Sequence, residues 1–265
     1  MNTLLSARQL NWHIGTTPIL KDVSLQLAAG ETLGIIGPNG AGKSSLLKLL
    51  AGIHDAGSGE LLLNGIAYAD MEPRAFARQL AYLEQDAQIN WPLLTEKVIQ
   101  LGRSAHQSAY GSFTLNDDEA IDRAIRITGV ERLLGRPVNH LSQGEKMLVS
   151  LARVFASQAG LILADEPVAA LDPYHQLLIM ELLKAHSQKE GQACMVVLHD
   201  LSLAARFCDR LLLLSGGKIV SSGSPAEVLS QENLREFYRI LCYSDFSQAI
   251  IQPQQRLQET PGITR

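Results

Sequence analysis

A glycine-rich segment near the N-terminus has the residue types and the spacing of a phosphate-binding loop. Residues 37–44 read Gly-Pro-Asn-Gly-Ala-Gly-Lys-Ser, which matches the pattern G-x-x-x-x-G-K-[S/T]. Glycines allow backbone N–H groups to surround phosphate oxygens, the lysine contacts the β- and γ-phosphates, and the serine hydroxyl binds Mg²⁺. We therefore expect a nucleoside triphosphate to bind at Gly37, Pro38, Asn39, Gly40, Ala41, Gly42, Lys43, Ser44 and Ser45.

Two acidic residues, Asp165 and Glu166, directly follow the apolar run Leu161–Ala164. An acidic pair at the end of a buried strand is costly unless a cation or solvent meets it. Asp165 fits the carboxylate that anchors Mg²⁺ beside a phosphate loop, together with Ser44. Glu166 is then placed to polarise the attacking water as a general base. Alone, such a pair could simply open a loop, and it is the phosphate loop that favours the catalytic interpretation.

The elements that must position these residues alternate between strands and helices. Short apolar runs predict buried strands over Thr32–Ile36, Cys194–Leu198 and Leu211–Leu214, with helices between them. This alternation predicts an α/β fold with a mostly parallel sheet. Before the phosphate loop, Val23–Leu27 is apolar at every second position, which is typical of a half-buried strand, and Asn64-Gly65 predicts a hairpin. An N-terminal antiparallel β subdomain is therefore expected.

The middle of the chain, about 87–155, is expected to be a mainly helical subdomain inserted into the ATPase domain of residues 1–240. Asn116 and Glu119 have the spacing of a helix-capping box, and apolar residues follow with a helical period. Ser224, Pro225 and Glu227 predict the start of a later helix. The pattern weakens after about residue 236, and 241–265 is expected to be a loose C-terminal extension.

Composition restricts the class of protein. The chain has 265 residues, 46% of them hydrophobic, and a net charge of −4, which gives no reason to expect nucleic acid binding. No apolar run approaches the roughly 20 residues of a membrane span, and Met1–Trp12 does not resemble a signal peptide. Cys194, Cys208 and Cys242 lack metal-ligand or redox spacing and are expected to be reduced and buried. These features favour a cytoplasmic protein.

Further segments make the chain resemble the ATP-binding cassette (ABC) ATPases up to about residue 240. Leu141–Glu145, which reads LSQGE, resembles the family signature LSGGQ, and Ala170–Asp172 resembles the loop that crosses the dimer. Gln85 resembles the glutamine-loop residue, and His199 the switch histidine. The resemblance implies a P-loop NTPase (RecA-like) core that uses ATP and Mg²⁺. It also implies that Gln85 senses Mg²⁺ and the attacking water, and that His199 contacts the γ-phosphate, with Glu166 as the base.

The same resemblance implies that two copies enclose two ATP molecules. Ser142 and Glu145 have the spacing of a capping box, so a helix N-terminus is expected there, where it can stabilise the γ-phosphate of the other copy. Ser142, Gly144 and Asp172 are therefore expected to contact nucleotide. Gln143 stands where the family usually has glycine, and Glu145 where it often has glutamine.

Adenine stacking is open from the sequence. The family's stacking aromatic stands just before a glycine in the N-terminal hairpin, where this chain has Ile14. Trp12 lies two residues earlier on the same strand face and can stack on adenine or belong to the core.

Three segments resemble, more narrowly, the importers of iron-siderophore complexes, haem and cobalamin: Leu101–His106, Leu198–Ala205 and Gly223–Val228. This resemblance implies a second copy, transmembrane permease subunits and, indirectly, a substrate-binding protein as partners. It places the chain peripherally on the cytoplasmic face of the bacterial inner membrane. Ile89–Leu94, with Trp91 as an anchor, is expected to contact the permease. Import of molybdate or another substrate, lipid export and iron–sulfur assembly are the alternatives.

Overall fold

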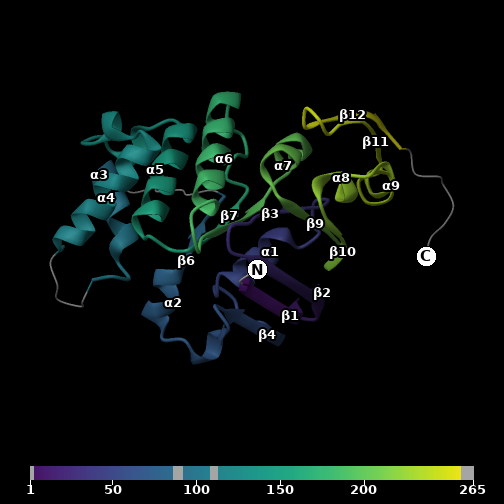
Figure 1. Ribbon diagram of the computed structural model, residues 1–265, viewed down its shortest axis with the longest axis horizontal. Coiled ribbons are helices and arrows are strands. Elements are labelled where there is room, and N and C mark those ends of the chain that lie inside the picture. Colours follow the sequence, from purple (N-terminus) through teal and green to yellow (C-terminus); the bar gives the residue numbers. More distant parts are fainter. Residues whose placement is uncertain (1–2, 86–91, 108–112, 258–265) are drawn as a thin grey trace.

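The computed structural model describes residues 3–85, 92–107 and 113–257. A central sheet has the strand order β10-β9-β3-β8-β7-β6 (Figure 1). All neighbouring strands in it are parallel except β10 and β9. The α/β fold with a mostly parallel sheet is therefore confirmed. Its strands are β3 (Thr32–Ile36), β6 (Leu80–Leu83), β7 (Leu161–Asp165), β8 (Ala193–Val197), β9 (Arg210–Ser215) and β10 (Lys218–Gly223).

The predicted N-terminal antiparallel sheet is also present, with the order β2-β1-β4-β5. Its strands are β1 (Thr3–Ile14), β2 (Thr17–Ala28), β4 (Ser58–Leu63) and β5 (Ile66–Ala67). Asn64 and Gly65 form the turn between β4 and β5 with φ of +52° and +78°, as a two-residue hairpin of this type requires.

The central sheet separates two hydrophobic cores. In β8, Cys194 and Val196 belong to the core shared with the large helices, whereas Met195 and Val197 belong to the core shared with the antiparallel sheet. The strands β7 and β9 divide their side chains between the cores in the same alternating way. A strand buried on both faces has no polar face to show, which explains the continuous apolar runs in the sequence.

Helices cover both faces of the sheet. Between β6 and β7, the described part of the chain is helical or irregular, with 3₁₀ turns between the helices, and contributes no further strand to either sheet, in agreement with the predicted helical segment (Figure 1). No helix among the described residues is long and apolar enough to cross a membrane. The helices are α1 (Lys43–Leu50), α2 (Pro73–Gln79), α3 (Thr95–Gln100), α4 (Leu115–Thr128), α5 (Gln143–Ala156), α6 (Pro173–Ser187), α7 (Leu201–Phe207), α8 (Pro225–Val228) and α9 (Gln231–Asn233).

The predicted cap of α4 is wrong by two residues. Thr114, not Asn116, is the N-cap, and its partner in the capping box is Asp117 rather than Glu119. Asp117 is fixed at this position because it also forms a buried ion pair with Arg103. The capping boxes predicted from Ser142 and Ser224 are present at the starts of α5 and α8.

The C-terminal segment is not loose over 240–256. The strands β11 (Ile240–Asp245) and β12 (Ile250–Arg256) pair into an antiparallel hairpin. Its residues Cys242 and Ile251 are buried in the core shared with the large helices. Ser202 of α7 donates to the carbonyl oxygen of Ile251 at 3.2 Å and accepts from its N–H at 3.0 Å. These contacts explain why the hairpin is ordered. The glutamines of β12 leave it without a clear apolar pattern, so the sequence analysis did not predict a strand there.

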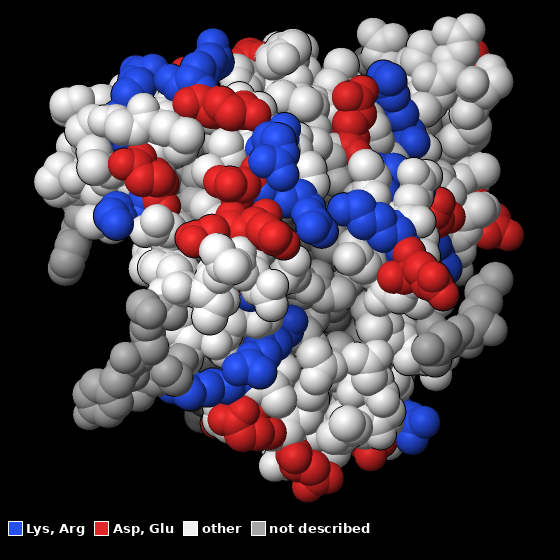
Figure 2. Space-filling view, turned by 60° about the vertical axis from the view of Figure 1, so that its left-hand side comes forward, with Lys and Arg blue, Asp and Glu red and all other residues white. Residues whose placement is uncertain are grey.

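The surface carries charges of both signs side by side. Figure 2 shows Lys and Arg interspersed with Asp and Glu on one face, so that face has no extended field of a single sign.

The expected permease contact at Trp91 lies outside the described residues. The nearby Leu94 is described and is 38% exposed.

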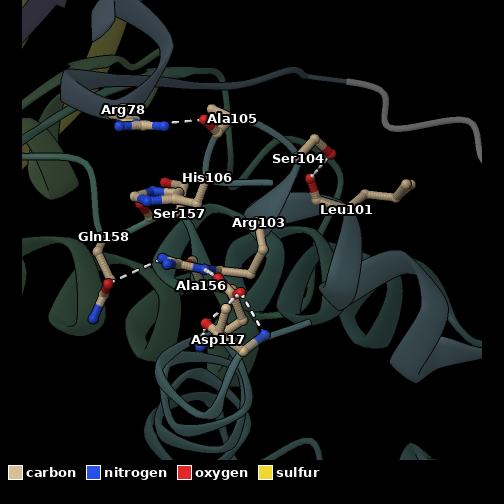
Figure 3. Close-up of polar contacts among 11 residues, drawn as sticks. Arg78, Leu101, Arg103, Ser104, Ala105, His106, Asp117, Ala156, Ser157 and Gln158 are labelled. Atoms are coloured by element: carbon tan, nitrogen blue, oxygen red, sulfur yellow. Dashed lines mark hydrogen bonds and ion pairs between the residues drawn. The ribbon is translucent and has the colours of Figure 1, made fainter. Parts of the chain in front are cut away.

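A buried ion pair holds the segment 101–107 between α4 and α5 (Figure 3). Arg103 Nε donates to Asp117 Oδ1 at 2.7 Å, and its Nη1 donates to the carbonyl of Ala156 and to Gln158 Oε1, both at 3.0 Å. Both charged side chains are at most 5% exposed. Hydrogen bonds from Thr114 and then the Arg103 guanidinium lower the pKa of Asp117 to about 2.

We expect Arg103→Met to reduce the free energy of unfolding by about 3–5 kcal/mol, because it leaves the Asp117 carboxylate buried without its counter-ion. Arg8→Met is the matched control. The Arg8–Glu60 pair is 63% and 50% exposed, so its loss should cost about 0–1 kcal/mol. Denaturant titration measures both. Because folding lowers the pKa of Asp117, the contribution of this carboxylate to the free energy of unfolding should be full above about pH 4. That contribution should be lost as the pH falls towards 2. Equal losses in the two variants would contradict this account.

Candidate functional site

The phosphate loop joins the end of β3 to the start of α1. At Gly37 a Cβ would lie 2.0 Å from the carbonyl oxygen of Leu214, so only glycine fits. Lys43 Nζ donates to the carbonyl oxygens of Gly37 at 2.9 Å and Pro38 at 3.1 Å, which places the ammonium against the loop backbone. Burial lowers the pKa of Lys43, and the negative charges of Glu166 and Asp165 oppose that effect.

Asp165 ends β7 beside the first turn of α1 and is 2% exposed. Ser44 Oγ donates to its Oδ1 at 2.9 Å, and the Tyr82 hydroxyl donates to its Oδ2 at 3.1 Å. Burial raises the pKa of Asp165, whereas these two hydrogen bonds lower it. A serine hydroxyl and a carboxylate oxygen this close together are the kinds of ligand that Mg²⁺ prefers.

Tyr82 is a residue of this site that sequence reasoning missed. It lies in β6, opposite Leu163 in the parallel register, so Asp165 follows two residues later on the same face of β7. Only the pairing of β6 with β7 brings the hydroxyl to the carboxylate. The sequence analysis predicted no strand before Gln85, so nothing in it pointed to Tyr82.

Glu166 accepts hydrogen bonds at both carboxylate oxygens. Gln85 Nε2 donates to Oε2 at 2.7 Å, and His199 Nε2 lies 2.5 Å from Oε1. The three residues come from the ends of β6, β7 and β8, neighbouring strands of the sheet. Glu166 has a φ of +47°, a conformation that is unfavourable for a non-glycine residue and is often found at functional sites. The structure thus brings Gln85, Glu166 and His199 together next to Asp165.

Ser142, Gly144 and Asp172 form a second group at the starts of α5 and α6. Ser142 is the N-cap of α5, in a capping box with Glu145, and hydrogen bonds from Ser142 lower the pKa of the Glu145 carboxyl. Asp172 is the N-cap of α6. Among the described residues, no hydrogen bond joins this group to the phosphate loop. The predicted nucleotide contacts of one chain therefore fall into two separate groups.

The two candidates for adenine stacking differ in their surroundings. The ring of Trp12 stacks on His54, with centroids 5.1 Å apart and an interplanar angle of 16°. The side chain is partly buried and packs against the core shared with the antiparallel sheet. One face of the indole is therefore already covered. Ile14 is 59% exposed.

Comparison with known proteins agrees with this arrangement. The sequence model of the family described as ABC transporter matches residues 20–169. The haemin import ATP-binding protein HmuV of Streptomyces coelicolor is 41% identical over 235 residues, which cover 89% of this chain and 83% of that protein.

Solved structures show the same fold. An ABC transporter of the metal-chelate type, in an inward-facing conformation, has a TM-score of 0.82 at 24% identity, covering 96% of this chain and 98% of that one. A dimeric bacterial ABC transporter cassette has a TM-score of 0.74 at 25% identity, covering 84% and 99%. These likenesses confirm the predicted P-loop NTPase core.

Proposed function

The chain belongs to the ABC transporter family, and from this premise we propose that it drives the uptake of haem or a related metal chelate through a separate permease. It is an ATPase whose hydrolysis of ATP is coupled to transport. The substrate class is supported by the 41% identity to a haemin import protein and by the importer-like segments of the sequence. We place it peripherally on the cytoplasmic face of the membrane, beneath permease subunits that work with a substrate-binding protein.

The phosphate loop would hold the triphosphate of ATP. Backbone N–H groups of residues 37–42 and the N-terminus of α1 present positive potential to the phosphates. Lys43 is already oriented into the loop by its bonds to two carbonyl oxygens, and it would exchange these for the β- and γ-phosphate oxygens.

Ser44 and Asp165 would hold Mg²⁺. Their oxygens lie 2.9 Å apart, and both are of the hard type that this ion prefers. When bound, the ion would neutralise charge on the phosphate oxygens. Gln85 would contribute its amide oxygen after turning away from Glu166, to which its amide nitrogen now donates. The Tyr82 hydroxyl would keep the second oxygen of Asp165 hydrogen-bonded.

Glu166 is the proposed general base, and its position carries the catalytic assignment. It directly follows the buried Asp165, but Ser44 and Tyr82 hydrogen-bond to Asp165 and not to Glu166. Glu166 can therefore face the attacking water without being a ligand of the metal. Gln85 and His199 hydrogen-bond its two oxygens in the structure. When ATP and Mg²⁺ bind, Gln85 would turn to the metal and His199 would donate to the γ-phosphate as charge develops there, which would free the carboxylate for the attacking water.

Two copies would complete each site. Within one chain the group formed by Ser142, Gly144 and Asp172 is separate from the phosphate loop, and the similar dimeric cassette supports a role for it across the interface. The N-terminus of α5 would then face the γ-phosphate held by the other copy. Gln143 would lie at the same surface, because it is the exposed first residue of α5.

The experiment that tests this function begins with the membrane partner. The chain is purified from detergent-solubilised membranes, and the co-purifying proteins are identified. We expect a polytopic permease. Recovery of soluble assembly proteins alone would contradict transport.

The complex is then placed in proteoliposomes with the substrate-binding protein, and ATP-dependent uptake of haemin, cyanocobalamin and a ferric siderophore is compared. We expect uptake of haemin above the other two, and none with Lys43→Ala, which removes the phosphate-binding cation. Molybdate is tested in the same assay, and its uptake without uptake of any of the three chelates would overturn the substrate assignment.

A further inference from the structure

His175, the third residue of α6, fills the space beside the glycine of the signature segment. A Cβ built at Gly144 would lie 2.6 Å from Cγ and Cδ2 of the His175 ring and 2.8 Å from Nδ1. All three distances are below the 3.0 Å that real Cβ contacts essentially never pass. The imidazole therefore occupies the volume that any side chain at position 144 would need.

The same ring holds the loop that precedes α6. Its Nδ1 lies 2.6 Å from Asp172 Oδ2, and the backbone N–H of His175 donates to Asp172 Oδ1 at 3.1 Å. An ionised carboxylate only accepts, so Nδ1 carries the proton. The hydrogen bonds from His175 lower the pKa of Asp172. Tyr174 contacts the ring edge-on, with centroids 5.4 Å apart, and the His175 side chain is only 17% exposed.

The loop that ends at Asp172 begins at the proposed base. The N–H of Ala169 donates to the carbonyl of Glu166 at 3.1 Å, and Ala170 has a φ of +58°. Internal hydrogen bonds and an unfavourable backbone angle make this a tight loop rather than a slack connection. Asp172 therefore lies at the end of a short, internally hydrogen-bonded loop that starts at Glu166.

We propose that His175 is a positioning residue for ATP hydrolysis, because its ring contacts the start of α5 through Gly144 and holds the loop of Glu166 through Asp172. It fixes the spacing of the two segments that face the second copy. The inference rests on the proposed function, in which these segments act on ATP across the dimer. It gives Gly144 a role within its own chain, in addition to any contact with nucleotide.

A suppressor experiment tests the contact. Gly144→Ala, His175→Ala and the double variant are compared with the wild type, at a temperature where melting curves show all four to be folded. Gly144→Ala should lower kcat at least about tenfold, since the methyl group meets the ring. In the double variant the methyl group takes the space that the ring has left, and kcat should recover at least about fivefold over Gly144→Ala. A double variant no more active than Gly144→Ala would overturn the proposal.

A second readout separates positioning from general stability. His175→Ala should lower kcat while leaving the KM for ATP and ATP binding by the monomer nearly unchanged, because the phosphate loop is untouched. His175→Asn, whose amide can still donate to Asp172, should retain more kcat than His175→Ala. Equal losses of kcat and ATP affinity in His175→Ala would contradict a positioning role. Hydrolysis of ATP by a monomeric wild type would contradict the proposed dimer. The His175 proposal is tested separately, because it depends only on comparing kcat among the wild type, the two single variants and the double variant.

Discussion

Glu166→Gln should bind ATP as the wild type does and hydrolyse it about 10²–10⁴ times more slowly, the usual contribution of a positioned general base. Glutamine keeps the size of the side chain but cannot take a proton from water. The local hydrogen bonds can also be kept, because the Gln85 amide can turn its oxygen towards the new amide while His199 still meets an oxygen. The loss should therefore appear in kcat and hardly in ATP affinity.

The same variant should accumulate as an ATP-bound dimer, since hydrolysis is the step that reopens it. Gel filtration in Mg-ATP and a phosphate-release assay measure the two effects on one preparation. Glu181→Gln is the matched control. Glu181 is exposed on α6, and the same chemical change there should leave both measurements as in the wild type. Hydrolysis by Glu166→Gln within about threefold of the wild type would remove Glu166 from the role of base.

Ser142→Arg should abolish ATP-dependent dimerisation and, with it, most of the ATPase activity. Ser142 is the exposed N-cap of α5, and its side chain accepts from the N–H of Glu145. Arginine removes the cap and places a long cation between the helix N-terminus and the ATP of the other copy. Binding of ATP to the monomer should survive, because the phosphate loop lies elsewhere in the chain.

Two further variants separate the helix cap from the interface. Ser224→Arg removes an equivalent capping box at the start of α8, at a similar cost of about 1 kcal/mol, and should leave dimerisation intact. Ser142→Asp keeps a good cap but sets a negative charge against the γ-phosphate, so it should also prevent dimerisation. Light scattering with Mg-ATP measures all three. Normal dimers of Ser142→Arg would rule out a signature that acts across the interface.

Local signals predicted most of the site. The phosphate loop and the Asp165-Glu166 pair each combine a short motif with an apolar strand, and Ser142 and Glu145 form a capping box within four residues. Such features depend on neighbours in sequence, and a single chain is enough to read them. Gln85 and His199 were found by family order, and the structure places both on Glu166.

Non-local packing explains what the sequence did not reveal. Tyr82 reaches Asp165 only because β6 lies beside β7, and His175 meets Gly144 only because α5 and α6 start side by side. The cap of α4 was misplaced because two possible boxes overlap, and the buried Arg103 selects the one that contains Asp117. The hairpin at 240–256 was missed because β12 is rich in glutamine and its contact with α7, through Ser202 and Ile251, joins residues far apart in the sequence.

The central sheet with a core on each face has a consequence for protein engineering. Successive side chains over Leu161–Ala164, Ala193–Val197 and Leu211–Leu214 alternate between the two cores, so neither core can melt while the other keeps these strands in register. The sheet is then a single cooperative unit. A minimal ATP-binding fragment cut from the phosphate-loop side would expose a full apolar layer to water and aggregate. Miniaturised versions of this protein should therefore shorten loops at its periphery and keep both layers whole.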